Sequence, residues 1–157
     1  MKVYRHTRFM RMANGVISTL LRLGLPMGPM ALLTVPGRES RLPRSTPVAL
    51  AVENGGWRLG APYGPVDWVK NLRKAGEAII TIRGRQVRVV ATELTPVEAA
   101  PHLRQALAEV NRSTRRVLSP YFDTQVDAPL EAWMAEATLH PMFRLVPKHG
   151  RDPDPVA

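Results

Sequence analysis

Residues 30–53 read MALLTVPGRESRLPRSTPVALAVE, and this stretch does most to decide the fold of the chain. Its two ends are aliphatic runs with the length and composition of β-strands. Glycine and proline set the connection between them. That connection carries three arginines within seven residues: Arg38, Arg41 and Arg44. A turn that holds several guanidinium groups between two strands is well placed to bind a phosphate or carboxylate group.

More strands follow this pair. Asn54-Gly55-Gly56 is a strong hairpin signal, and a second tight turn is expected at Gly84. The expected strands are Met30–Val35, Thr46–Glu53, Trp57–Ala61, Glu77–Ile82, Gln86–Leu94 and Met142–Val146. A doubly wound sheet would need a helix between successive strands, and these hairpins have none. The pattern therefore predicts an α+β protein built on a small barrel of mostly antiparallel strands.

Helices are expected before, between and after these strands. Thr95-Pro96-Val97-Glu98 is a capping box, from which a helix should run to Val110. Asp67 is expected to cap a short helix that Ala75-Gly76 closes. The other expected helices are Thr7–Leu23, Trp68–Lys74, Arg112–Leu118 and Asp127–Ala137, the last started by Pro129.

The first of these helices is amphipathic, because apolar residues from Phe9 to Leu23 recur at helical spacing while Arg8, Arg11 and Arg22 fall off that stripe. The favoured interpretation is a helix packed on the domain with its arginines in solvent. The alternative is a helix lying on an anionic membrane surface. Arg22 interrupts the apolar run, so we interpret this N-terminal segment as a retained helix rather than a signal peptide.

The chain of 157 residues is expected to form one domain. Its expected parts are an N-terminal amphipathic helix over residues 1–25, a barrel over residues 26–147, and a disordered tail over residues 148–157. The net charge is +9, and the first 44 residues hold eight basic residues against one acid. Such a field favours anionic partners. Aromatic residues make up only 6% and are not interleaved with the basic ones, which argues against nucleic acid.

The familiar catalytic motifs are missing from the sequence. There is no cysteine, no nucleophile elbow, no phosphate-binding loop and no glycine-rich dinucleotide motif. The four histidines are scattered without a metal-ligand spacing. Glu131 and Glu136 are expected in solvent, on the surface of a short helix. If the protein is an enzyme, a cofactor should therefore supply the chemistry, in a cytoplasmic setting that the absence of cysteine fits.

Two groups of residues could hold such a cofactor. The arginine-rich turn offers donors for an anion, namely Arg38, Ser40, Arg41, Arg44, Ser45 and Thr46. The alternative is a solvated basic hairpin in which Glu39 neutralises one arginine. Trp68-Val69-Lys70-Asn71-Leu72 is the second group. Trp68 and Asn71 share a helix face that could meet a planar ring by stacking and by an amide hydrogen bond, or Trp68 belongs to the core and Asn71 bonds nearby backbone.

These motifs occur in an order that resembles the deazaflavin-dependent nitroreductase family, whose members have a split β-barrel fold. The resemblance is carried by Met30 to Pro47, by Ala61-Pro62-Tyr63-Gly64 and by Asp67 to Leu72. Residues 120–123 and 140–145 also look like a subgroup of that family. The resemblance implies the coenzyme F-420, an 8-hydroxy-5-deazaflavin with a phosphate and a glutamate tail, and less readily FMN.

The resemblance also assigns roles. Arg38, Ser40 and Arg44 match positions that hold the phosphate and tail, and Thr46 and Pro47 match positions beside the ring. Ala61 to Gly64, including Pro62, match a loop along the ring, while Trp68 and Asn71 border the cofactor. Tyr63 is the expected proton donor, with a packing tyrosine as the alternative.

The implied reaction is hydride transfer to a quinone, enone or nitroaromatic acceptor by a monomer or homodimer, in the cytoplasm or at the inner face of the cell membrane. A non-catalytic carrier of a lipid, fatty acid or other flavin on the same fold is the alternative.

Overall fold

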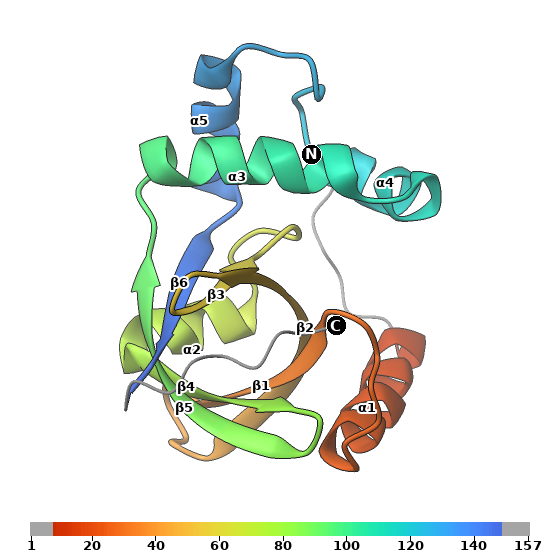
Figure 1. Cartoon of the computed structure of the whole chain (residues 1–157), viewed down its shortest axis with the longest axis vertical. Coiled ribbons are helices and arrows are strands. Elements are labelled where there is room, and N and C mark those ends of the chain that lie inside the picture. Colours follow the sequence, from red (N-terminus) through yellow and green to blue (C-terminus); the bar gives the residue numbers. More distant parts are fainter. Residues whose placement is uncertain (1–7, 149–157) are drawn as a thin grey trace.

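A closed barrel of six strands forms the centre of the molecule (Figure 1). The computed structural model describes residues 8–148, and side chains from Met10 on. The strands are β1 (Met30–Pro36), β2 (Pro43–Glu53), β3 (Gly56–Gly60), β4 (Glu77–Ile82), β5 (Arg85–Glu93) and β6 (Met142–Pro147). Their order is β1-β2-β3-β6-β5-β4, and β4 closes the barrel against β1. Every neighbouring pair is antiparallel, so the predicted barrel is confirmed.

The barrel interior follows from the period of two along each strand. In β5, for example, Val89 is buried while Arg88 and Val90 on either side are exposed. Helix α2 (Asp67–Ala75) adds Val69 and Leu72 to the same core. The largest side chains fully enclosed there are Leu33, Trp57, Leu59, Leu72, Ile80, Phe143 and Leu145.

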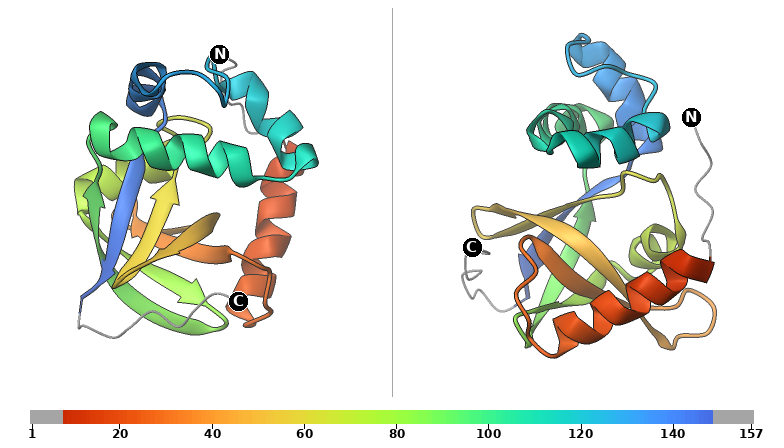
Figure 2. Two further views of the ribbon diagram at one scale, coloured as in Figure 1. Left: turned by 45° about the horizontal axis from the view of Figure 1, so that its top comes forward. Right: turned by 90° about the vertical axis from the view of Figure 1, so that its right-hand side faces the viewer.

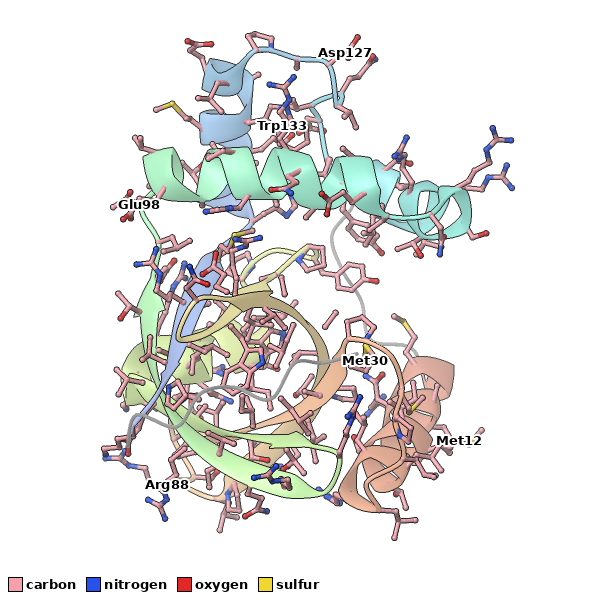
Figure 3. All side chains as sticks on the ribbon, in the orientation of Figure 1. Met12, Met30, Arg88, Glu98, Asp127 and Trp133 are labelled. Carbon is pink, nitrogen blue, oxygen red and sulfur yellow. The ribbon has the colours of Figure 1, made fainter. Side chains whose placement is uncertain are left out.

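A layer of helices covers one end of the barrel (Figures 1 and 2). It consists of α3 (Pro96–Glu109), α4 (Arg112–Leu118), a 3-10 turn η1 (Ser119–Tyr121) and α5 (Leu130–Leu139). Trp133 lies at the centre of a second apolar cluster where α3 meets α5 (Figure 3). The predicted helices here are confirmed to within a few residues.

The helix ends test two predicted caps. The capping box is confirmed, because the Thr95 side chain accepts from the Glu98 N–H and the Thr95 N–H donates to Glu98 Oε2 at 2.8 Å. The predicted cap at Asp67 is wrong. Val66 occupies the N-cap of α2 without a side-chain bond, and the Asp67 carboxylate lies 3.1 Å from the Arg38 guanidinium. A tertiary ion pair has taken the place of the local bond.

Pro47 lies in the middle of β2, because the strand begins at Pro43 and not at Thr46 as predicted. Residues 43–49 pair with β1 alone, because β3 pairs only with residues 50–53. The Leu50 N–H donates towards β1, to Pro29 O. Successive N–H groups along a strand point in alternate directions, so an N–H at position 47 would point away from β1, to the unpaired side of β2. Proline, which has no N–H, is therefore tolerated there.

Helix α1 (Arg8–Arg22) packs against β1, β2 and β4. Leu21 is buried, but Met12, Val16 and Leu23 are 68%, 58% and 73% exposed. The expectation that the apolar stripe packs on the domain is therefore only half right. Within residues 8–148, no helix has the length and apolar character needed to cross a membrane.

Lys148, the first residue of the expected C-terminal tail, lies in the described part of the chain. Lys148 is anchored, because its N–H donates to Arg88 O at 2.9 Å and its Nζ lies 2.7 Å from Glu77 Oε2. Residues 149–157, like Thr7 at the predicted helix start, lie outside the described residues.

Candidate functional site

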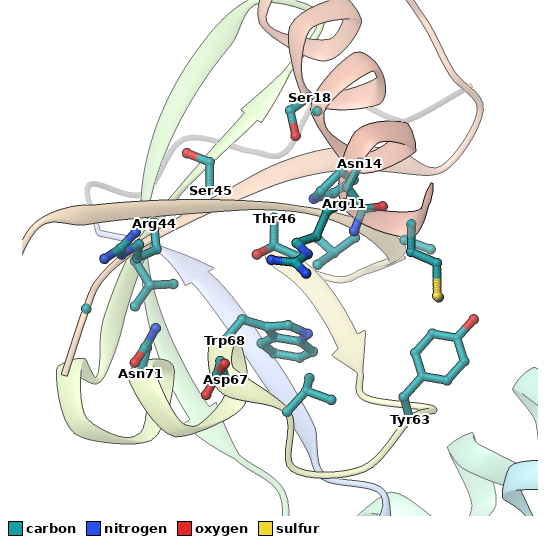
Figure 4. A pocket seen from close by; sticks show the side chains of 18 of the residues that line it. Arg11, Asn14, Ser18, Arg44, Ser45, Thr46, Tyr63, Asp67, Trp68 and Asn71 are labelled. Carbon is teal, nitrogen blue, oxygen red and sulfur yellow. The ribbon is translucent and has the colours of Figure 1, made fainter. Parts of the chain in front are cut away.

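A groove of about 1440 Å³ opens where β2 and β3 separate (Figure 4). The unpaired half of β2 forms its floor. The other walls are the polar side of α1, the loop from Gly60 to Val66, and the first turns of α2, with two residues of α4 at the rim. The split in the barrel, which Pro47 helps to keep unpaired, therefore creates the site.

Most of the predicted site residues lie together along this groove. They are Arg38, Ser40, Arg44, Ser45, Thr46, Pro47, Pro62, Tyr63, Trp68 and Asn71. They come from the β1–β2 turn, β2, the loop after β3, and α2, so four separate segments meet here.

Four predicted residues are not among those lining the groove. Arg41 has a left-handed backbone (φ 60°) and lines a separate cavity of about 210 Å³ beside Glu77 and Arg88. Lys70 is exposed, because neighbouring residues of a helix lie on different sides and Asn71 occupies the side that faces the groove. Ala61 and Gly64 belong to the loop after β3, and both are buried.

Two of the arginines that line the groove, Arg38 and Arg44, differ in their partners. Arg38 Nη1 lies 3.1 Å from both Asp67 Oδ1 and Asn71 Oδ1, so Arg38 is held against α2. Arg44 is exposed, and no acid among the described residues pairs with it. Arg44 is therefore a cation on the wall of the groove that is available to an anionic ligand.

For Trp68 and Asn71, the alternative interpretation, a core tryptophan and an amide bonded to nearby backbone, is partly right. The Trp68 ring packs against the core residue Phe143, with 6.1 Å between ring centroids, and also lines the groove. Asn71 is buried, and its Oδ1 accepts from the Arg38 N–H at 3.1 Å. Asn71 thus fixes the arginine turn to α2, while Trp68 offers a surface to a ring.

The phenol of Tyr63 stands at the other end of the groove (Figure 4). Burial raises its pKa above 10.0, and the neighbouring Tyr121 adds to the shift. The rings of Tyr63 and Tyr121 meet edge to face, with centroids 5.0 Å apart. A phenol with a raised pKa stays protonated at neutral pH and can donate a proton.

Sequence reasoning missed the α1 wall. Arg11, Asn14, Ser18 and Arg22 line the groove, although their side of the helix was expected in solvent. In the close-up, Arg11 points towards Thr46 and Trp68 (Figure 4). These residues recur every three or four positions, so they form a polar stripe, and that spacing was the signal available in the sequence.

The residues present fit a deazaflavin with an acidic tail. Arg11, Arg22 and Arg44 supply positive charge, Ser40 and Thr46 supply neutral polar groups, and Trp68 supplies an aromatic surface. The groove exceeds the roughly 300–1,000 Å³ typical of pockets for drug-sized ligands, as an extended cofactor requires. Glu39 also lines the groove and is the one acid in the turn.

Comparisons with known proteins identify the family of the chain. The family model described as F420H(2)-dependent quinone reductase matches residues 2–119. A solved structure described as an F420-H2 dependent reductase (FDR-A) is 18% identical, with a TM-score of 0.50 over 74% of this chain and 93% of that one. No curated protein matches.

Two further solved structures show the same fold. An FMN-binding protein related to pyridoxamine 5'-phosphate oxidase, from Nostoc punctiforme, is 12% identical with a TM-score of 0.53, covering 92% of this chain and 83% of that one. A structure described as a domain-swapped dimer is 17% identical, also with a TM-score of 0.53, over 83% and 94% of the two chains.

The split barrel is the fold of these solved structures, and its groove combines positive charge with an aromatic wall. The chain belongs to the F420H(2)-dependent quinone reductase family, whose model covers three quarters of it. Its cofactor is accordingly the reduced deazaflavin coenzyme, with FMN only a secondary option. Membership of an enzyme family also favours the oxidoreductase over the alternative of a non-catalytic carrier.

Proposed function

We propose that the protein transfers a hydride from the reduced deazaflavin to a quinone or a similar electron-poor acceptor, such as an enone or a nitroaromatic. The observation that carries the proposal is the groove itself, with Arg44 at one end, Arg11 and Trp68 along it, and the protonated Tyr63 at the other end (Figure 4). The coenzyme supplies the hydride. Arg44 binds the acidic tail, Trp68 orients the ring, and the Tyr63 phenol donates the proton that the reduced acceptor needs.

Coenzyme binding is tested by titrating the protein with oxidised coenzyme F-420 and following tryptophan fluorescence, with FMN in parallel. Trp57 and Trp133 are fully buried, so Trp68 should report the ligand. We expect saturable quenching by the deazaflavin, weaker binding of FMN, and loss of most of the quenching in Trp68→Phe. Failure of both cofactors to bind would contradict the proposal.

A second proposal concerns where the acceptor is met. The exposed apolar residues Met12, Val16 and Leu23 follow one side of α1, and Leu25 just beyond the helix is also exposed. Arg11 and Arg22 are exposed and adjoin Met12 and Leu23 in the sequence, although both also line the groove. An exposed apolar face beside basic residues suits the surface of an anionic membrane, where lipid-soluble quinones dissolve.

Replacing Met12 and Leu23 together by serine should weaken binding to vesicles of anionic and zwitterionic lipid by roughly tenfold or more, because two apolar side chains no longer leave water. Co-sedimentation measures the effect. Val97→Ser is the matched control, since Val97 is as exposed as these residues but lies on α3. Equal binding by the double variant and the wild type would refute membrane attachment through this face.

A further inference from the structure

A carboxylate and an imidazole are buried together beneath the helical layer, and the proposed reaction does not use them directly. Glu136 in α5 and His140 just after it are 2% and 1% exposed. Glu136 Oε2 lies 3.1 Å from His140 Nε2. The expectation that Glu136 lies in solvent is therefore wrong. Burying a carboxylate away from water is costly unless polar partners compensate it, so the contacts of this pair matter.

Both residues hold the segment that follows η1. Glu136 Oε1 accepts from the Asp123 N–H at 2.6 Å. The His140 ring stacks on Phe122, with 4.1 Å between centroids and 20° between planes. Within the described chain neither His140 ring nitrogen is hydrogen-bonded, so stacking and the nearby carboxylate fix the ring.

This anchoring matters because α4 and η1 contribute only partly buried side chains, Leu118 and Tyr121, to the second apolar cluster. Neither α4 nor η1 contributes a buried residue. Phe122 is the first buried side chain after Leu107. The contacts of Phe122 and Asp123 with the buried pair are therefore the deepest anchor of the connection next to Tyr121.

The same region supports Tyr63 from two sides. Tyr121, next to Phe122, places its ring against that of Tyr63. The loop that carries Tyr63 rests on the chain around His140, because the Ala61 N–H donates to Pro141 O at 2.9 Å. The buried pair thus contacts, or adjoins in the chain, both segments that hold the Tyr63 ring: the one that carries Tyr121 and the one that bonds the loop after β3.

We propose that Glu136 and His140 are positioning residues for Tyr63, which they hold in place through Phe122, Tyr121 and the loop after β3. The proposal rests on the proposed function only in the role it gives to Tyr63 as proton donor. The placement of the Tyr63 ring can be tested without cofactor or substrate.

The first test is fluorine NMR of the protein labelled with fluorotyrosine, without coenzyme. The chain has three tyrosines, and Tyr63→Phe assigns the resonance of Tyr63. Glu136→Ala should shift and broaden this resonance, whereas Glu136→Gln, which keeps an oxygen for the Asp123 N–H, should restore most of its position. Glu131→Gln, an exposed change on the same helix, should leave the spectrum unchanged.

If Glu136→Ala does not fold, Phe122→Leu replaces it, because leucine fills the apolar site without the stacking on His140. A folded variant with lowered thermal stability and an unaltered Tyr63 resonance would overturn the proposal, because the pair would then only stabilise the fold. This outcome is independent of whether coenzyme F-420 binds.

The second test is kinetic. In Glu136→Ala or Phe122→Leu, turnover should fall roughly tenfold to a hundredfold while the coenzyme Kd stays within about twofold, because only the proton donor Tyr63 is displaced. In a Tyr63→Phe background the further loss should vanish. Equal losses in both backgrounds would show that the pair does not act through Tyr63.

Discussion

Replacing Tyr63 by phenylalanine should lower turnover by about a hundredfold or more while leaving coenzyme binding nearly intact. General acids contribute roughly a hundredfold to ten-thousandfold to proton-transfer steps, and phenylalanine removes the acid while keeping the ring. The ring must be kept because it packs on Tyr121. Steady-state turnover with a quinone acceptor, together with the coenzyme Kd from fluorescence, separates the two effects.

The pH profile sharpens this test. Because burial raises the pKa of Tyr63 above 10.0, the phenol stays protonated as the pH rises through neutrality, and its ionisation should not reduce wild-type turnover there. Turnover in Tyr63→Phe equal to that of the wild type would remove this phenol from the reaction and make solvent the proton source.

Replacing Arg44 by alanine should weaken binding of the deazaflavin roughly tenfold to a hundredfold, corresponding to the about 1.5–3 kcal/mol expected for a hydrogen bond to a charged group. Arg44 projects from the unpaired half of β2, and Arg38 is already held by Asp67 and Asn71. Loss of this cation should also reduce the dependence of coenzyme affinity on salt concentration.

Arg41→Ala is the matched control, since it removes the same charge from the same turn. Arg41 lines the separate cavity beside Glu77 and Arg88, so coenzyme affinity should change by no more than about twofold once long-range charge is screened by salt. Equal losses from the two substitutions would mean that the turn acts through its overall charge, and the assignment of Arg44 as a direct contact would fail.

The sequence alone determined the elements of the barrel. The structure has a strand at β5, a turn at Asn54-Gly55-Gly56 and a capping box at Thr95, all close to where local sequence patterns predicted them. Local patterns suffice for these features because their stabilising contacts join residues close together in the chain. The arginine-rich turn could be located for the same reason.

Tertiary structure decided which side of each element became functional. Arg41 and Arg44 are three residues apart, yet a left-handed turn and the strand pairing direct them to different cavities. Helix α1 puts its polar stripe on the groove and leaves Met12 exposed. Glu136 is buried because α5 packs on α3. Each of these outcomes depends on contacts between segments distant in the sequence, and periodicity reveals that a helix or strand has two sides without saying what will cover each one.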